Sequence, residues 1–162
     1  MTSDFKIVNE KLAQAVGILR EQSVDAWLVF ARETTLTPDP CIGLIASMEF
    51  TWHSAFLVSH TGERVAVVGR FDAENVKAIG GYTQVIPYDE SFRPPLKDAI
   101  TRLNPASIAL DYSENDPAAD GLTHGMYLEL MNTFAGTLFA DLFVSAARLV
   151  GSLRGRKSTT EV

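Results

Sequence analysis

The chain has 162 residues, of which 46% are hydrophobic and 21% are charged, and its formal net charge is -6. A chain of this length is expected to form one soluble domain that buries roughly 70% of its unfolded surface. The acidic charge argues against a nucleic-acid partner, which needs a basic footprint. No stretch approaches the roughly 20 apolar residues of a membrane helix, so no membrane partner is expected.

Cys41 is the only cysteine. It excludes an internal disulfide and a zinc site built from several cysteines, and it fits a reducing compartment. The N-terminal stretch MTSDFKIVNEK contains acidic residues and no apolar core, so it does not resemble a secretory signal. We therefore predict a cytoplasmic protein. Because no histidine can be placed beside Cys41 from the sequence, a buried or loop thiol is the preferred interpretation over a nucleophile.

The first predicted elements are a helix and a strand. Between Asp4 and Gln22, apolar residues recur every three or four positions, which predicts an amphipathic helix with Lys11, Arg20 and Glu21 facing water. The stretch DAWLVF (25–30) is continuously apolar, which indicates a strand covered on both faces.

An irregular segment and a hairpin follow. Pro38 and Pro40 exclude the segment before residue 53 from a sheet interior. The stretches SAFLVS (54–59) and RVAVVG (64–69) flank HTGE, a hairpin signal in which Gly62 takes a positive φ at the turn.

The second half alternates helices and strands. Asp72 is expected to cap a helix over 73–79. The stretch TQVIPY predicts a strand that ends at Pro87, and residues 92–103 predict another helix. SIALDY predicts a further strand, and Asp120 is expected to cap a helix with an apolar residue at every fourth position from Leu122. TLFADLF (137–143) is expected to form an edge strand, followed by a helix over 146–153. This order predicts an α/β fold: a mixed sheet containing one β-hairpin, with helices on both faces.

The densest group of chemically active side chains is the acidic loop DYSENDPAADGLTH (111–124). Asp111, Asp116, Asp120 and His124 offer oxygen and imidazole ligands for a divalent metal in a stand-alone enzyme. The spacing fails the calcium-loop pattern, however, and Asp and Asn beside Pro117 and Gly121 are also typical of a turn. A free-standing interaction module using this loop is a further alternative.

Trp52 and His53 lie between the irregular segment and the hairpin. Aromatic residues at such a place line ligand or partner surfaces, and they also serve simple packing. Both interpretations remain open on the sequence.

The chain ends in a capping-box pattern. In Ser158-Thr159-Thr160-Glu161, the Ser hydroxyl and the Glu carboxylate are spaced to bind each other's backbone N–H groups, as at the start of a helix. A frayed polar tail is the alternative.

Four stretches together resemble the N-terminal domain of the creatinase/prolidase superfamily, the M24 metallopeptidases that include Xaa-Pro aminopeptidases. They are EKLAQAVGILREQSVDAWLVF, SAFLVSHTGERVAVVGRFDAENV, SIALDYSENDPAADGLTHGMY and LVGSLRGRKSTTEV. The resemblance implies a three-layer α/β/α domain over residues 1–152. It also implies that residues 153–162 are the junction with an absent catalytic domain, whose first helix opens with an LR-x-x-K-S-x-x-E pattern.

For function, the resemblance implies a non-catalytic domain that helps to form a homodimer and to close the substrate pocket of a metal-dependent Xaa-Pro peptidase or related hydrolase. The metal pair (Mn, Co or Zn) would belong to the catalytic domain, so no cofactor, catalytic residue or metal ligand is expected in this chain. The loop from Arg32 to His53, with Trp52, is the expected surface towards that pocket or towards a second subunit. It departs from the N-x-x-Y-L-T-G-like stretch of the family, which leaves peptide specificity open.

Overall fold

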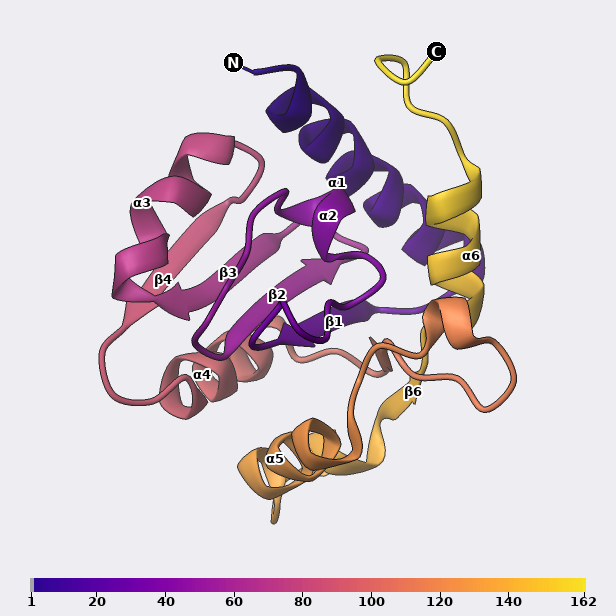
Figure 1. The fold of residues 1–162 in the computed structure, drawn as a ribbon. Helices are drawn as coiled ribbons and strands as arrows, with labels where there is room; N and C mark the ends of the chain where they lie inside the picture. Colours follow the sequence, from indigo (N-terminus) through magenta and orange to yellow (C-terminus); the bar gives the residue numbers. More distant parts are fainter. Residues whose placement is uncertain (1) are drawn as a thin grey trace.

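The computed structural model describes residues 2–162 and contains one sheet of six strands, in the order β4-β3-β2-β1-β5-β6 (Figure 1). The strands are β1 (Ala26–Ala31), β2 (Ser54–Ser59), β3 (Arg64–Gly69), β4 (Gln84–Tyr88), β5 (Ile108–Leu110) and β6 (Phe143–Ser145). β2 runs antiparallel to both of its neighbours, and all other neighbouring strands are parallel. The mixed sheet is confirmed.

Helices cover both faces of this sheet. They are α1 (Ser3–Gln22), α2 (Ile42–Ile45), α3 (Arg70–Ile79), α4 (Arg93–Leu103), α5 (His124–Phe134) and α6 (Ala147–Gly155), with short 3-10 helices at Pro117–Ala119 and Leu138–Asp141. α1, α2, α3 and α6 pack into one core, and α4 and α5 pack into a second core on the other face (Figure 1). The three-layer α/β/α architecture is confirmed.

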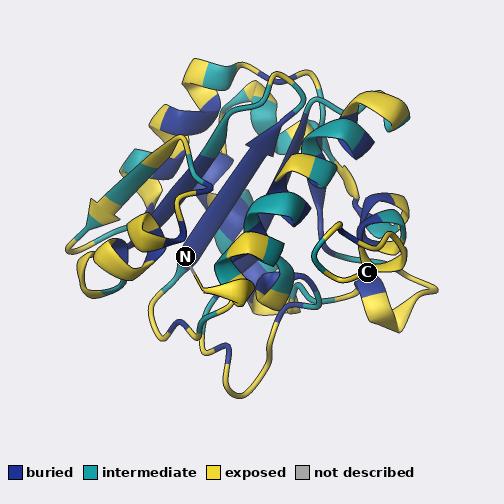
Figure 2. Cartoon of the chain, turned by 90° about the horizontal axis from the view of Figure 1, so that it is seen from above, coloured by how far each residue is buried: buried dark blue, intermediate teal, exposed yellow. Residues whose placement is uncertain are grey.

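The central strands are buried on both sides, as their continuous apolar sequences predict. Every residue of β1 and β2 is buried (Figure 2). Side chains alternate between the faces of a strand, so Trp27 and Val29 enter one core and Leu28 and Phe30 enter the other. The hairpin between β2 and β3 is also confirmed, and Gly62 has a φ of 101°, a conformation that favours glycine.

Two predicted helix caps and one predicted strand are wrong. α3 begins at Arg70 with Gly69 as its N-cap, because the chain passes directly from β3 into the helix, and Asp72 lies within the first turn. α5 is capped by Thr123, whose Oγ1 accepts from the Met126 N–H, rather than by Asp120. The last edge strand is β6, because β5 pairs with Phe143–Ser145, and most of the predicted strand is instead a 3-10 helix.

Lys11 is buried rather than exposed to water. Only 1% of it is accessible, because the C-terminal segment lies across α1 at this point. Its Nζ donates to the backbone oxygens of Leu153 and Arg156 and lies 3.0 Å from the Glu161 carboxylate. A cation placed among two carbonyl oxygens and a carboxylate is well satisfied, which is what burial of a lysine requires.

The capping box at the C-terminus is formed. The Ser158 N–H donates to Glu161 Oε2 at 2.6 Å, and the Glu161 N–H donates to Ser158 Oγ at 3.3 Å. Thr160 donates through its backbone N–H and its hydroxyl to the Glu10 carboxylate of α1. Residues 158–161 are therefore held against α1, beside the N-terminal half of the chain (Figure 1).

Within residues 2–162, none of the helices combines the length and the apolar character needed to cross a membrane.

Candidate functional site

The segment from Arg32 to His53, called here the site loop, leaves and re-enters the sheet at one point. Ala31 at the end of β1 pairs with Ser54 at the start of β2. Arg32 and His53 directly flank this pair, so the antiparallel register brings the two ends of the loop together. Strand pairing therefore places Arg32 and His53, two residues of the predicted site, close to each other.

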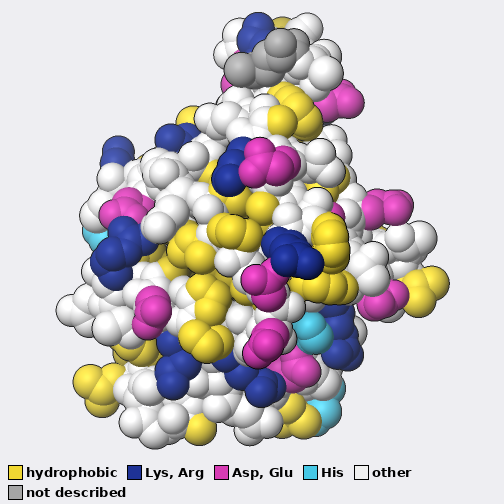
Figure 3. Space-filling model, turned by 90° about the vertical axis from the view of Figure 1, so that its left-hand side faces the viewer, with side chains coloured by type: hydrophobic (Ala, Val, Ile, Leu, Met, Phe, Trp, Pro, Cys, Tyr) yellow, Lys and Arg dark blue, Asp and Glu magenta, His cyan; other side chains and the backbone are white. Residues whose placement is uncertain are grey.

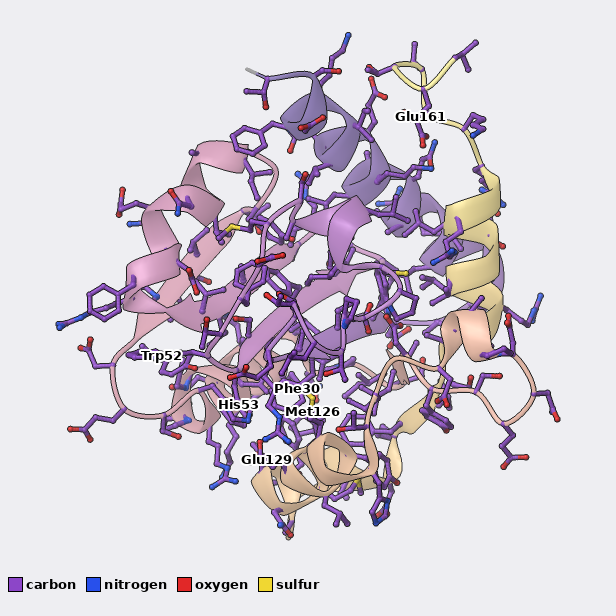
Figure 4. The ribbon with its side chains drawn as sticks, viewed as in Figure 1. Phe30, Trp52, His53, Met126, Glu129 and Glu161 are labelled. Atoms are coloured by element: carbon purple, nitrogen blue, oxygen red, sulfur yellow. The ribbon has the colours of Figure 1, made fainter. Side chains whose placement is uncertain are left out.

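His53 forms a cluster with two aromatic rings that also contact each other, and it lies against an acidic side chain of α5. Its ring stacks on Phe30 at 5.6 Å and on Phe92 at 5.1 Å between centroids. Its Nε2 lies 2.7 Å from Glu129 Oε2, and both side chains retain some exposure, 27% and 30%. Figure 4 shows His53, Phe30 and Glu129 gathered between the sheet and α5.

The environment of His53 keeps its imidazole neutral. Burial lowers the pKa of His53, the nearby Arg32 charge lowers it further, and the Glu129 carboxylate acts in the opposite direction. A neutral imidazole at neutral pH is suited to hydrogen bonding with a ligand or to accepting a proton.

We expect the His53→Gln variant to lose less stability on acidification than the parent chain. Since the pKa of His53 is lowered on folding, the unfolded chain binds more protons, and stability falls as the pH drops below about 6.5, the ordinary histidine pKa. Urea unfolding at about pH 7 and about pH 5 measures the difference. His124→Gln, on an exposed position of α5, is the matched control. Equal losses in parent and His53→Gln would contradict the prediction.

The Trp52 side chain points towards α3 and β4 rather than towards the ring of His53 (Figure 4). It packs edge-on to Phe71 at 5.7 Å and lies 6.0 Å from the Tyr88 ring. A Cβ at Gly69 would lie 2.5 Å from Trp52 Cε3, so glycine is required for this close packing. With 38% of its surface exposed, Trp52 is both packed and accessible.

A cavity of about 510 Å³ opens between the site loop and the end of β4. Trp52 and His53 line it together with Glu33 and Thr51 of the same loop and with three residues outside the predicted site: Tyr88, Asp89 and Glu90. The Tyr88 hydroxyl donates to the His53 backbone oxygen at 2.7 Å, which fixes the wall of this cavity. Figure 3, which looks onto the side of the molecule where α3 and β4 lie, shows apolar side chains interspersed with acidic and basic ones.

The groups that line this cavity are suited to binding a ligand. It offers aromatic faces, one imidazole and three carboxylates, groups that bind amines and peptide N–H donors. Glu129 was also missed, because it occupies an ordinary mid-helix position and meets His53 only through the packing of α5 against the sheet.

The four residues of the predicted acidic site do not converge. Asp116 Oδ1 accepts from the Ala118 N–H in its own turn, and Asp120 Oδ1 accepts from the Ser113 N–H. Asp120 and His124 line a cavity of about 400 Å³ with Tyr112, Leu122 and Tyr127. Asp111 instead points into the core, where its Oδ1 accepts from Trp27 Nε1 at 2.6 Å.

Among residues 2–162, one group brings three ligand-capable side chains within 4.8 Å of one another: Asp39, Cys41 and Asp111. All three are buried, and burial raises the pKa of the Cys41 thiol and of both carboxyl groups. A thiol in this environment is a poor nucleophile, which agrees with the interpretation of Cys41 as a buried residue.

No family model matches the sequence, and no curated protein matches it either. Solved structures do match. An X-Pro aminopeptidase from Thermotoga maritima is 15% identical, with a TM-score of 0.67 over 91% of this chain and 36% of that one. An Xaa-Pro dipeptidase from Bacillus anthracis is 17% identical, with a TM-score of 0.65 over 95% of this chain and 38% of that one.

The chain thus spans a little over a third of each of these two proteins. It also matches the creatinase/prolidase N-terminal domain of an X-Pro dipeptidase from Streptococcus pyogenes, at 14% identity and a TM-score of 0.62, over 89% of this chain and 98% of that domain. The three-layer arrangement, the mixed sheet and this nearly complete overlap agree: the chain has the fold of the creatinase/prolidase N-terminal domain.

Proposed function

We propose that this chain is the non-catalytic N-terminal domain of a metal-dependent Xaa-Pro aminopeptidase, dipeptidase or related hydrolase, and that it helps to form a dimer and to close the substrate pocket. Residues 1–152 would form the domain, and residues 153–162 the junction with a catalytic domain that holds a pair of Mn, Co or Zn ions. The proposed location is the cytoplasm.

The observation that carries the proposal is the site loop with its cavity. The fold resembles domains of Xaa-Pro peptidases, and the accessible groups Trp52, His53 and Glu33 gather at one end of the sheet. Aromatic and carboxylate groups that surround an open cavity supply a surface for a peptide or for a second subunit. The capping box held on α1 supplies a preformed start for a following helix.

The first test is an activity assay on the chain itself. We expect no hydrolysis of Xaa-Pro dipeptides or tripeptides when Mn, Co or Zn is added, because the proposal places the metal pair outside this chain. Metal-dependent turnover by highly purified chain would contradict the non-catalytic role.

The second test is Trp52→Ala in a polypeptide that joins this chain to its catalytic domain. We expect kcat/KM to fall about tenfold, equivalent to about 1.4 kcal/mol, beyond the loss of stability that follows from removing the packing of Trp52 on Phe71 and Tyr88. Leu138→Ala is the control, since Leu138 is an exposed large apolar residue that does not line the 510 Å³ cavity. Normal kinetics with a lowered melting temperature would assign Trp52 to packing alone.

A further inference from the structure

Two carboxyl groups from distant parts of the chain meet in the core. Asp39 belongs to the site loop and is 5% exposed, and Asp111 directly follows β5 and is 2% exposed. Each already has one oxygen bound to an N–H donor. Trp27 Nε1 donates to Asp111 Oδ1 at 2.6 Å, and the Cys41 N–H donates to Asp39 Oδ1 at 2.8 Å.

The remaining oxygen of Asp111 has no N–H or O–H donor from any described residue. This Oδ2 atom is completely buried, and the neighbouring acidic group is the carboxyl of Asp39. Two carboxylates are acceptors only, so they cannot satisfy each other, whereas one proton between them forms a carboxyl–carboxylate hydrogen bond.

The other charged and titratable groups around the pair do not replace this proton. Cys41 lies beside both carboxyl groups and is itself held in its neutral thiol form by burial. From α6, the Arg154 guanidinium approaches this region, but it donates to the Pro40 backbone oxygen at 2.9 Å. On the side of the acidic loop the pair faces Gly121, which has no side chain.

We propose that Asp39 and Asp111 share one proton, and that this hydrogen-bonded pair is the link that fastens the middle of the site loop to the end of β5. The pair acts on the position of the loop, and its consequence for a reaction rests on the proposed function. The pair itself is testable in this chain alone.

The proposal has a defined pH dependence. Burial raises the pKa of both carboxyl groups, so the folded chain binds more protons than the unfolded chain, in which aspartate has a pKa of about 3.9. The stability supplied by the shared proton is therefore complete at low pH and is lost as the pH rises through the folded-state pKa. Above it, two buried carboxylates repel each other and the loop loses its link to β5.

The decisive variant is Asp111→Asn. An asparagine keeps an oxygen for the Trp27 N–H and supplies its own N–H for the Asp39 carboxylate, so it replaces the shared proton with a permanent donor. The quantity to compare is the melting temperature of the variant minus that of the parent. We expect this difference to be near zero at about pH 4 and to grow to several degrees in favour of the variant at about pH 9. Asp39→Asn should behave alike, and Asp116→Asn, at an exposed turn position, should track the parent.

Two further measurements separate a shared proton from other roles. Infrared spectra of the parent should show the C=O stretch of a protonated carboxyl group that fades as the pH rises, and this signal should be absent from both asparagine variants across the same pH range. Limited proteolysis within residues 35–38, which are exposed, should accelerate with pH in the parent more than in Asp111→Asn. That readout reports the position of the loop rather than global stability.

Parallel melting curves for parent and Asp111→Asn across the pH range would overturn the proposal, as would an infrared spectrum without the protonated carboxyl signal. If Asp111→Asn does not fold, Asp39→Asn decides by the same comparison. A parent whose melting temperature drops on addition of EDTA, with the drop abolished in Asp111→Asn, would show that a metal ion rather than a proton bridges the two groups, and would also overturn the proposal.

Discussion

Lys11→Met is expected to lower the free energy of unfolding by about 3 kcal/mol, since removing one partner of a buried ion pair costs roughly 3–5 kcal/mol and Glu161 retains some contact with water. The variant leaves the Leu153 and Arg156 backbone oxygens without their donor and the Glu161 carboxylate without its cation. Met has a volume similar to that of Lys, so the packing of the aliphatic part of this side chain on its neighbours is largely kept. Urea unfolding of parent and variant at neutral pH measures the loss.

The matched control is Lys6→Met, because Lys6 lies on the same helix and is exposed. Its effect should stay within about 0.5 kcal/mol, as for most surface substitutions. If Lys11→Met lost as little free energy of unfolding as Lys6→Met, the buried Lys11 contacts would not hold the C-terminal segment on α1. Glu161→Gln should cost less than Lys11→Met, because the lysine still keeps its two carbonyl partners.

Gly121→Ala should cost about 2–3 kcal/mol, within the range for forcing additional atoms into a packed region. A Cβ at this position would lie 2.2 Å from Pro40 Cδ and 3.2 Å from Asp39 Cα. The second of these atoms is backbone, so the site loop as a whole would have to move. Such a shift would also separate Asp39 from Asp111, and the variant should therefore lose the pH dependence assigned to that pair.

Gly43→Ala controls for the general effect of replacing glycine. A Cβ at Gly43 meets nothing within 4 Å, and Gly43 lies in the short helix α2 of the same loop. Alanine there is expected to be neutral or to stabilise by about 0.5–1 kcal/mol. If both alanine variants changed stability equally, the close approach of the acidic loop to Asp39 would not be the cause.

The sequence pattern predicted most of the secondary structure because burial on one or both faces of an element sets the spacing of its apolar residues. The continuous apolar runs of β1 and β2 reflect helices on both faces of the sheet, and the four-residue spacing from Leu122 reflects the buried side of α5. The capping box was also predictable from the sequence, because its two residues, Ser158 and Glu161, lie only three positions apart. Local patterns of this kind are formed by neighbours in the chain.

Prediction failed where several residues nearby offer the same local chemistry. Thr123 and Asp120 are both good N-cap residues, and the one that caps α5 is set by the path of the acidic loop, whose Gly121 and Leu122 N–H groups bind the Asp111 backbone oxygen. Lys11 looked solvent-exposed because the residues that cover it, Leu153 to Glu161, lie more than 140 positions further along.

By itself, the sequence determined the order of helices and strands, the hairpin, the capping box and the resemblance to a known domain. The tertiary structure alone decided that Glu129 meets His53, that Lys11 anchors the C-terminal segment and that Asp39 meets Asp111. The physical reason is that periodicity and capping depend on residues a few positions apart. Contacts between distant residues, and the pKa values that they set, depend on how layers pack, and a buried lysine or aspartate has the same local sequence as an exposed one.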